Sequence, residues 1–136
     1  MSTATLTFAS PLPGLESAEG FSLRGIVGAE GLFALESANP PARMFVADAS
    51  VYVPEYAPVI PDTALAAVGL GSRGQGTTLV VVNPSPEKTT VNLMAPIVLN
   101  PATGACLQVI LDGGRYPLRA ELGSWNETPS NGQFTG

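Results

Sequence analysis

Residues 77–82, Thr77-Thr78-Leu79-Val80-Val81-Val82, form the most apolar short run of the chain, and Asn83-Pro84-Ser85-Pro86 ends it abruptly. A run of this length that is rich in β-branched side chains and bounded by turn residues is typical of a strand buried in the core. We therefore expect 77–82 to lie at the core of a sheet.

Similar short runs flank this segment on both sides. The chain has 15 glycines and 13 prolines, which punctuate it because glycine reaches backbone angles closed to other residues and proline fixes φ. The expected strands are 3–10, 21–27, 32–37, 44–49, 51–53, 89–99, 107–111 and 116–122. Segments 21–27 and 32–37 are expected to form a hairpin through Gly28-Ala29-Glu30-Gly31.

One short helix is predicted over Asp62–Val68. Asp62 is expected to accept hydrogen bonds from the first free amides, and Gly69 is expected to close the helix. The segment Ser72-Arg73-Gly74-Gln75-Gly76 is expected to be a flexible loop. Because strand follows strand almost throughout, the predicted fold is mainly β: a single-domain, antiparallel, barrel-like sheet with one short helix.

The strand 89–99 contains Pro96, which has no N–H to donate to a neighbouring strand. This stretch is therefore expected to be bulged or to lie at the edge of the sheet. Residues 1–122 are expected to form the domain. Residues 123–136, rich in Ser, Asn, Thr and Gly, are expected to be a polar flexible tail, although Trp125 and Phe134 leave a docked tail open.

The formal net charge is −5, from 11 acidic and 6 basic side chains. Such a surface repels nucleic acid and favours a basic protein partner, although mild acidity also aids solubility. The chain has one cysteine, Cys106, which is read as a small buried hydrophobe. No apolar run reaches the roughly 18 residues of a membrane helix, and no basic amino-terminal leader precedes an apolar stretch. We expect a cytoplasmic protein without a membrane or direct nucleic-acid partner.

The residues for catalysis are scarce. The chain has no histidine, which removes the commonest general base and the usual metal ligand. Lys88, the only lysine, lies in a turn beside Glu87 that is expected to be solvated, whereas a catalytic lysine needs a desolvated pocket to lower its pKa. We therefore predict no enzyme activity, no catalytic residues, no cofactor and no metal site.

The segment Glu87-Lys88-Thr89-Thr90-Val91-Asn92-Leu93-Met94-Ala95-Pro96-Ile97-Val98-Leu99-Asn100 is distinctive. Together with Gln108–Leu111 and Tyr116–Arg119, it closely resembles the flagellar assembly factor FliW. Upstream pieces agree in order: Leu12-Pro13-Gly14-Leu15, Phe33–Ser37, Met44–Val46, Pro54-Glu55-Tyr56 and Asp62–Leu70. The resemblance covers about residues 5–122.

The resemblance implies an antiparallel β-barrel-like fold and a role without catalysis. It implies that the protein binds and antagonises the translational regulator CsrA, and that flagellin competes with CsrA for it. With flagellin bound, CsrA is free to repress flagellin translation; when flagellin is exported, CsrA is captured. We expect a monomer when the protein is free. The alternative is a small barrel that binds a ligand or serves as a structural accessory.

The residues that we predict to bind a partner are Pro13, Gly14, Tyr56, Asn92, Pro96, Asn100, Gln108, Tyr116 and Arg119. Several have a structural alternative. The Asn92 amide either satisfies nearby backbone groups or bonds a partner. Tyrosines 56 and 116 are either interface anchors or core residues with a surface hydroxyl. Gln108 and Arg119 either pair with groups at the barrel rim or contact a partner.

Overall fold

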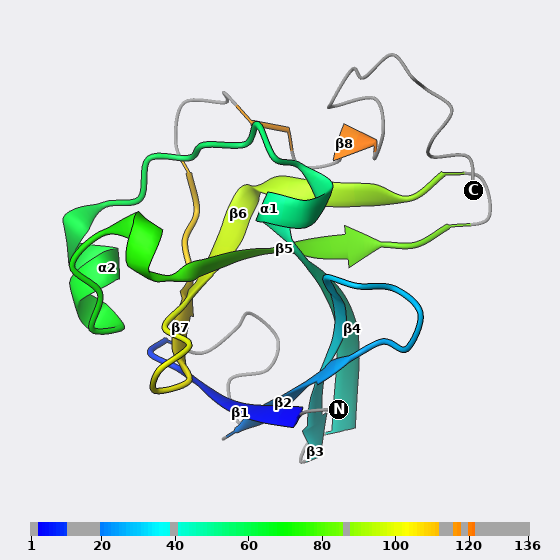
Figure 1. Cartoon of the computed structure of the whole chain (residues 1–136), viewed down its shortest axis with the longest axis horizontal. Coiled ribbons are helices and arrows are strands. Elements are labelled where there is room, and N and C mark those ends of the chain that lie inside the picture. Colours follow the sequence, from blue (N-terminus) through cyan, green and yellow to red (C-terminus); the bar gives the residue numbers. More distant parts are fainter. Residues whose placement is uncertain are drawn as a thin grey trace.

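Seven of the nine segments expected to be strands pair edge to edge and close into a barrel (Figure 1). The structure is a computed structural model that describes residues 3–10, 20–38, 41–85, 88–111, 116–117 and 120–121. Its strands are β1 (Thr3–Phe8), β2 (Phe21–Gly25), β3 (Leu32–Ala38), β4 (Pro41–Asp48), β5 (Thr77–Asn83), β6 (Thr90–Leu99), β7 (Ala105–Gln108) and β8 (Ala120–Glu121). The tail predicted for 123–136 lies outside the described residues.

The barrel is built from seven strands in the order β5-β4-β3-β2-β1-β7-β6, and a pairing of β5 with β6 closes it. The predicted hairpin between β2 and β3 is confirmed. The prediction of a purely antiparallel barrel needs one correction, because β1 and β7 run parallel. Their contact is short, pairing Thr7 with Ala105 and Phe8 with Cys106. The barrel is therefore mixed, with the parallel pair completing its wall.

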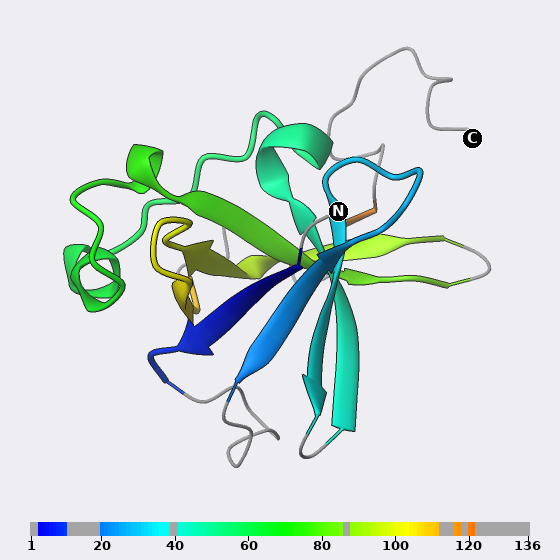
Figure 2. The same ribbon diagram turned by 60° about the horizontal axis from the view of Figure 1, so that its bottom comes forward.

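Strand β6 changes partners along its length at a large bulge. Its last part pairs with β5 and β7, and its first part pairs with β5 and β8. Between these parts the register shifts, so that residues 93–96 stand opposite the single residue Val80. In both views the ends of β5 and β6 extend beside the barrel as a two-stranded arm (Figures 1 and 2). Pro96 is thus in a bulge, and the alternative that it marks a sheet edge is wrong because β6 is paired on both sides.

The barrel interior is filled by the side chains that alternate inward along its strands. Nine buried residues form this cluster: Leu6, Phe21, Leu23, Leu35, Val46, Leu79, Ile97, Leu99 and Cys106. The outward-facing Val80 is also fully buried, because it belongs to a second cluster under the segment after β4. Burial on both faces explains why 77–82 is apolar without alternation.

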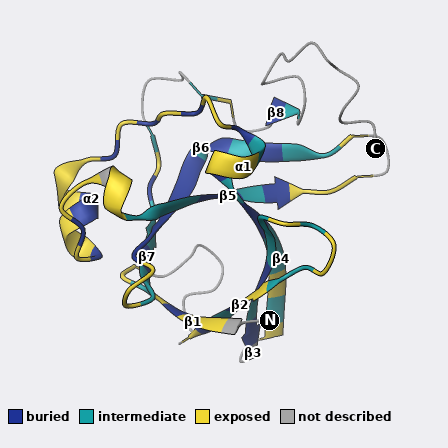
Figure 3. Cartoon of the chain, in the orientation of Figure 1, coloured by how far each residue is buried: buried dark blue, intermediate teal, exposed yellow. Residues whose placement is uncertain are grey.

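Two short helices cover the outside of the barrel, where the sequence predicted one. Helix α1 (Ala49–Tyr52) occupies residues expected to be extended, because Asp48 caps it by accepting a hydrogen bond from the Ser50 N–H at 2.9 Å. Helix α2 (Asp62–Ala67) is where it was predicted. Both helices turn buried residues toward the strands and exposed residues outward (Figure 3).

Two details of the predicted connections differ. The cap residue of α2 is Pro61, whose side chain makes no capping bond, and Asp62 is the first residue inside the helix. Gly69 does follow the helix with a positive φ of 79°. The expected loop at 72–76 contains a 3-10 turn, η1 (Arg73–Gln75), beside which the Gln75 side chain accepts a hydrogen bond from the Gly71 N–H at 2.7 Å.

Candidate functional site

The nine residues predicted to bind a partner fall into three groups. Pro13, Gly14 and Arg119 lie outside the described residues. Five others, from distant parts of the chain, converge on the β6 bulge: Tyr56, Asn92, Pro96, Gln108 and Tyr116. Asn100 stands apart, at the turn between β6 and β7.

The Asn92 side chain holds the bulge from within. Its Oδ1 accepts hydrogen bonds from the Met94 N–H at 2.9 Å and the Ala95 N–H at 3.1 Å. Pro96 follows and has no N–H to satisfy. The structural alternative stated for Asn92 is therefore the one that the contacts favour.

The remaining backbone groups of the bulge also have partners. The Leu93 N–H donates to the Pro117 carbonyl oxygen at 3.0 Å. Each of the four carbonyl oxygens accepts one hydrogen bond. Side chains supply two of the donors: the Tyr56 hydroxyl donates to the Leu93 oxygen, and the Gln108 amide donates to the Ala95 oxygen. Backbone groups supply the other two: the Leu111 N–H donates to the Met94 oxygen, and the Val109 N–H donates to the Pro96 oxygen. Buried backbone groups must be paired. These hydrogen bonds therefore allow β6 to leave its register without an energetic penalty from unsatisfied groups.

The two tyrosines belong to the outer core cluster. Their rings meet edge to face, with centroids 4.9 Å apart and an interplanar angle of 87°. The Tyr116 hydroxyl donates to the Ala57 carbonyl oxygen at 3.3 Å. Tyr56 is 5% exposed, and its hydroxyl points inward to Leu93. Tyr56 is therefore a core residue whose hydroxyl is inside, which neither alternative foresaw.

Asn100 connects α2 to the β6–β7 turn. It is 7% exposed, and its Nδ2 donates to the Val68 carbonyl oxygen at 2.8 Å. Its Oδ1 accepts from the Ala102 N–H at 3.0 Å. The hydrogen bonds and packing of these six residues give each a place in stabilising the fold. Their contact with a partner stays a prediction.

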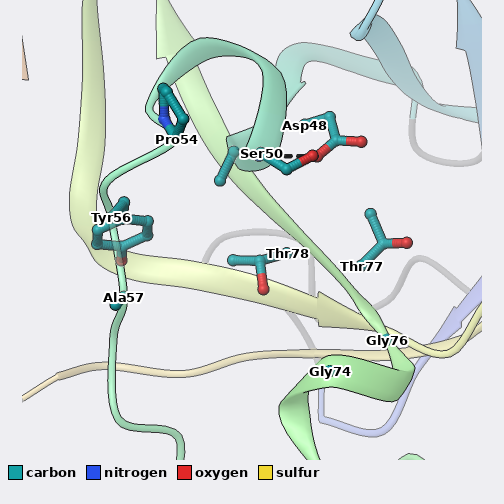
Figure 4. Close-up of a pocket in the computed structure, with 10 residues that line it drawn as sticks. Asp48, Ser50, Pro54, Tyr56, Ala57, Gly74, Gly76, Thr77 and Thr78 are labelled. Atoms are coloured by element: carbon teal, nitrogen blue, oxygen red, sulfur yellow. Dashed lines mark hydrogen bonds between the residues drawn. The ribbon is translucent and has the colours of Figure 1, made fainter. Parts of the chain in front are cut away.

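A cavity that the sequence did not reveal lies on the outer side of the barrel, between α1 and η1. Its volume is about 350 Å³. In Figure 4, Asp48 and Ser50 stand at the α1 end, Gly74 and Gly76 at the opposite end, and Tyr56 and Ala57 along one side. Thr77 and Thr78 of β5 lie between these ends. The only sequence signal was Asp48 followed two residues later by Ser50, a pair that can cap a helix. It was not recognised, because residues 44–49 and 51–53 were expected to be strands.

The charges of the described residues are unevenly distributed. Each basic side chain that the structure describes is in an ion pair: Arg24 and Arg43 with Glu36 at 3.3 and 3.8 Å, and Lys88 with Glu121 at 2.8 Å. The carboxylates that form no ion pair with another described residue are Glu30, Asp48, Glu55 and Asp62. The last three belong to segment 48–62, which covers the outside of the barrel. Glu30 lies next to this segment, since the Glu30 carbonyl oxygen accepts a hydrogen bond from the Tyr52 hydroxyl.

The described residues offer little for catalysis. The hydrogen bond and charge of Glu121 raise the pKa of Lys88, the opposite of what an amine nucleophile requires. Burial raises the pKa of the Cys106 thiol to about 12, which leaves it protonated and unreactive. No three His, Cys, Asp or Glu side chains of the described part gather closely enough to hold a metal ion. Within the same part, no helix combines the length and apolar character required to cross a bilayer.

These features define a class: a small, closed, mixed β-barrel with a filled interior, a helix-covered outer wall and an acidic outer cavity. The family model described as "FliW protein" matches residues 1–122. The flagellar assembly factor FliW of Syntrophotalea carbinolica is 33% identical over 121 residues, which are 87% of this chain and 86% of that protein. The FliW of Geotalea uraniireducens is 33% identical over 96 residues, 69% of this chain and 59% of that protein.

A solved structure gives the same answer. The crystal structure of a flagellar assembly factor FliW superposes with a TM-score of 0.77 at 25% identity, covering 86% of this chain and 84% of that one. The chain belongs to the FliW family. The resemblance stated from segment 87–119 is confirmed, and so is the mainly β, barrel-like fold.

Proposed function

We propose that this protein regulates flagellar assembly by binding two proteins in alternation, a CsrA-type translational regulator and flagellin. The observation that carries the proposal is the family match over residues 1–122, together with relatives that are named flagellar assembly factors. In this proposal the protein acts in the cytoplasm, as a monomer when free, and without catalysis.

The charge distribution supports a basic partner. A CsrA-type regulator carries positive charge because it holds RNA. Within the described part of the chain, the four carboxylates that form no ion pair lie on or beside segment 48–62, and the described cations are paired elsewhere. An acidic surface of this kind attracts a basic protein and repels RNA phosphate. Binding would then both capture the regulator and disfavour its RNA complex.

The test is a titration of a CsrA–RNA complex with this protein, using CsrA, RNA and flagellin from the same source. We expect RNA to be released as the protein is added and to rebind CsrA when flagellin is added in excess. Raising the salt concentration should weaken CsrA capture, because charge attraction is screened. If the protein binds neither CsrA nor flagellin in a direct pull-down, the proposal is wrong.

A further inference from the structure

The outer cavity presents a fixed negative charge. One carboxylate oxygen of Asp48, Oδ1, accepts hydrogen bonds from the Ser50 N–H at 2.9 Å and the Ser50 hydroxyl at 2.7 Å. These bonds orient the carboxylate at the α1 end of the cavity (Figure 4). The second oxygen, Oδ2, makes no hydrogen bond or ion pair with another described residue. It is available to a ligand without loss of the helix cap.

The rest of the cavity suits a long cationic side chain. None of the described residues that line it is basic. Thr77 and Thr78 add hydroxyl groups, which accept hydrogen bonds as well as donate them. Pro54, Tyr56 and Ala57 form a less polar side along which an aliphatic stem can pack.

We propose that this cavity receives an arginine side chain of the basic CsrA-type partner, with its guanidinium on Oδ2 of Asp48. Arginine fits best because its planar group donates several hydrogen bonds at once, to the carboxylate and to neighbouring hydroxyls. The inference rests on the proposed function for the identity of the partner. It adds the place of contact and the chemical group that is recognised there.

The test compares two variants with the same change of charge. Asp48→Asn removes the negative charge of the cavity, yet keeps an oxygen that caps α1, since Asn and Asp are equally good cap residues. Asp62→Asn removes one charge from an exposed carboxylate that does not line the cavity. With purified CsrA as the probe, calorimetry should show about tenfold weaker binding for Asp48→Asn. Asp62→Asn removes the same charge from the acidic surface but from outside the cavity, so its binding should weaken clearly less.

A second pair of variants tests the cavity if Asp48→Asn lowers the melting temperature. Ser50→Lys places a tethered cation two residues from Asp48, where it competes with the arginine of the partner. Thr63→Lys adds the same charge at an exposed position of α2. Ser50→Lys should weaken CsrA binding about tenfold, and Thr63→Lys clearly less.

The outcomes separate the two proposals. If the wild-type protein binds neither CsrA nor flagellin, the proposed function fails, and this inference fails with it. If the wild type binds CsrA and the two members of each pair bind equally well, the function stands and the cavity proposal is overturned. A clearly larger loss for Asp48→Asn and Ser50→Lys than for Asp62→Asn and Thr63→Lys supports the cavity as the arginine site.

Discussion

Replacing Asn92 with alanine tests whether one side chain holds the β6 bulge. The change removes the oxygen that accepts from the N–H groups of Met94 and Ala95, at 2.9 and 3.1 Å. Ala95 is 5% exposed and Met94 is half-buried, so water replaces the lost acceptor poorly. An unsatisfied buried donor costs about 1–3 kcal/mol. For the two together we expect a loss of about 3 kcal/mol in the free energy of unfolding, a large share of the stability of a small domain.

The assay is equilibrium unfolding in urea, followed by far-ultraviolet circular dichroism. The matched control is Asn92→Asp, which keeps an acceptor oxygen at the same position and should stay within about 1 kcal/mol of the wild type at pH 7. The slope of unfolding free energy against urea should be unchanged in both variants, since the surface exposed on unfolding is the same. The reasoning is refuted if Asn92→Ala unfolds at the wild-type midpoint, or if Asn92→Asp is as unstable as Asn92→Ala.

Three further changes probe other parts of the barrel. Tyr56→Phe leaves the Leu93 carbonyl oxygen without its side-chain donor, and urea unfolding should show a loss of about 1–2 kcal/mol. Gly104→Ala should lower the melting temperature clearly, with a loss of about 2 kcal/mol or more, because Gly104 has a φ of 86° and an added Cβ would overlap the Thr5 carbonyl oxygen. Burial raises the pKa of the Cys106 thiol from 9.0 to about 12. The thiol of the unfolded chain therefore ionises first, and the free energy of unfolding should fall as pH rises from 9 toward 12. Between pH 7 and pH 10, the free energy of unfolding of the wild type, measured in urea, should fall by about 1.4 kcal/mol more than that of Cys106→Ala.

Each of these changes has a contrary result. An unchanged urea midpoint in Tyr56→Phe would mean that water satisfies the Leu93 carbonyl. For Gly104→Ala the control is Gly25→Ala, where an added Cβ meets nothing within 4 Å. Equal melting temperatures for the two variants would contradict the predicted overlap with the Thr5 carbonyl oxygen. If Cys106→Ala and the wild type respond identically to alkaline pH, the thiol is not shielded from solvent in solution.

The pattern of short apolar runs and turn residues determined most of the strand layout. It located the β2–β3 hairpin, the buried strand β5 and the helix α2. It also predicted either a bulge or a sheet edge at Pro96, because a proline inside a strand removes one hydrogen bond of the ladder. These are local consequences of side-chain shape and backbone freedom, so neighbouring residues suffice to state them. The family, too, was evident from segment 87–119.

Other features depended on contacts between residues far apart in the sequence. The parallel β1–β7 pair joins Thr7 to Ala105, and the tyrosine that satisfies the bulge comes from position 56. Helix α1 forms because packing in the outer cluster and the Asp48 cap override an extended pattern.

The cavity likewise exists only because segments 48–57 and 74–78 meet outside the barrel. The sequence by itself therefore determined which segments are strands and which family they belong to. Only the tertiary structure decided which polar side chains are used inside the fold and which carboxylates remain available at its surface. The physical reason is that a hydrogen bond or an ion pair depends on distance in space, which the order of residues does not give.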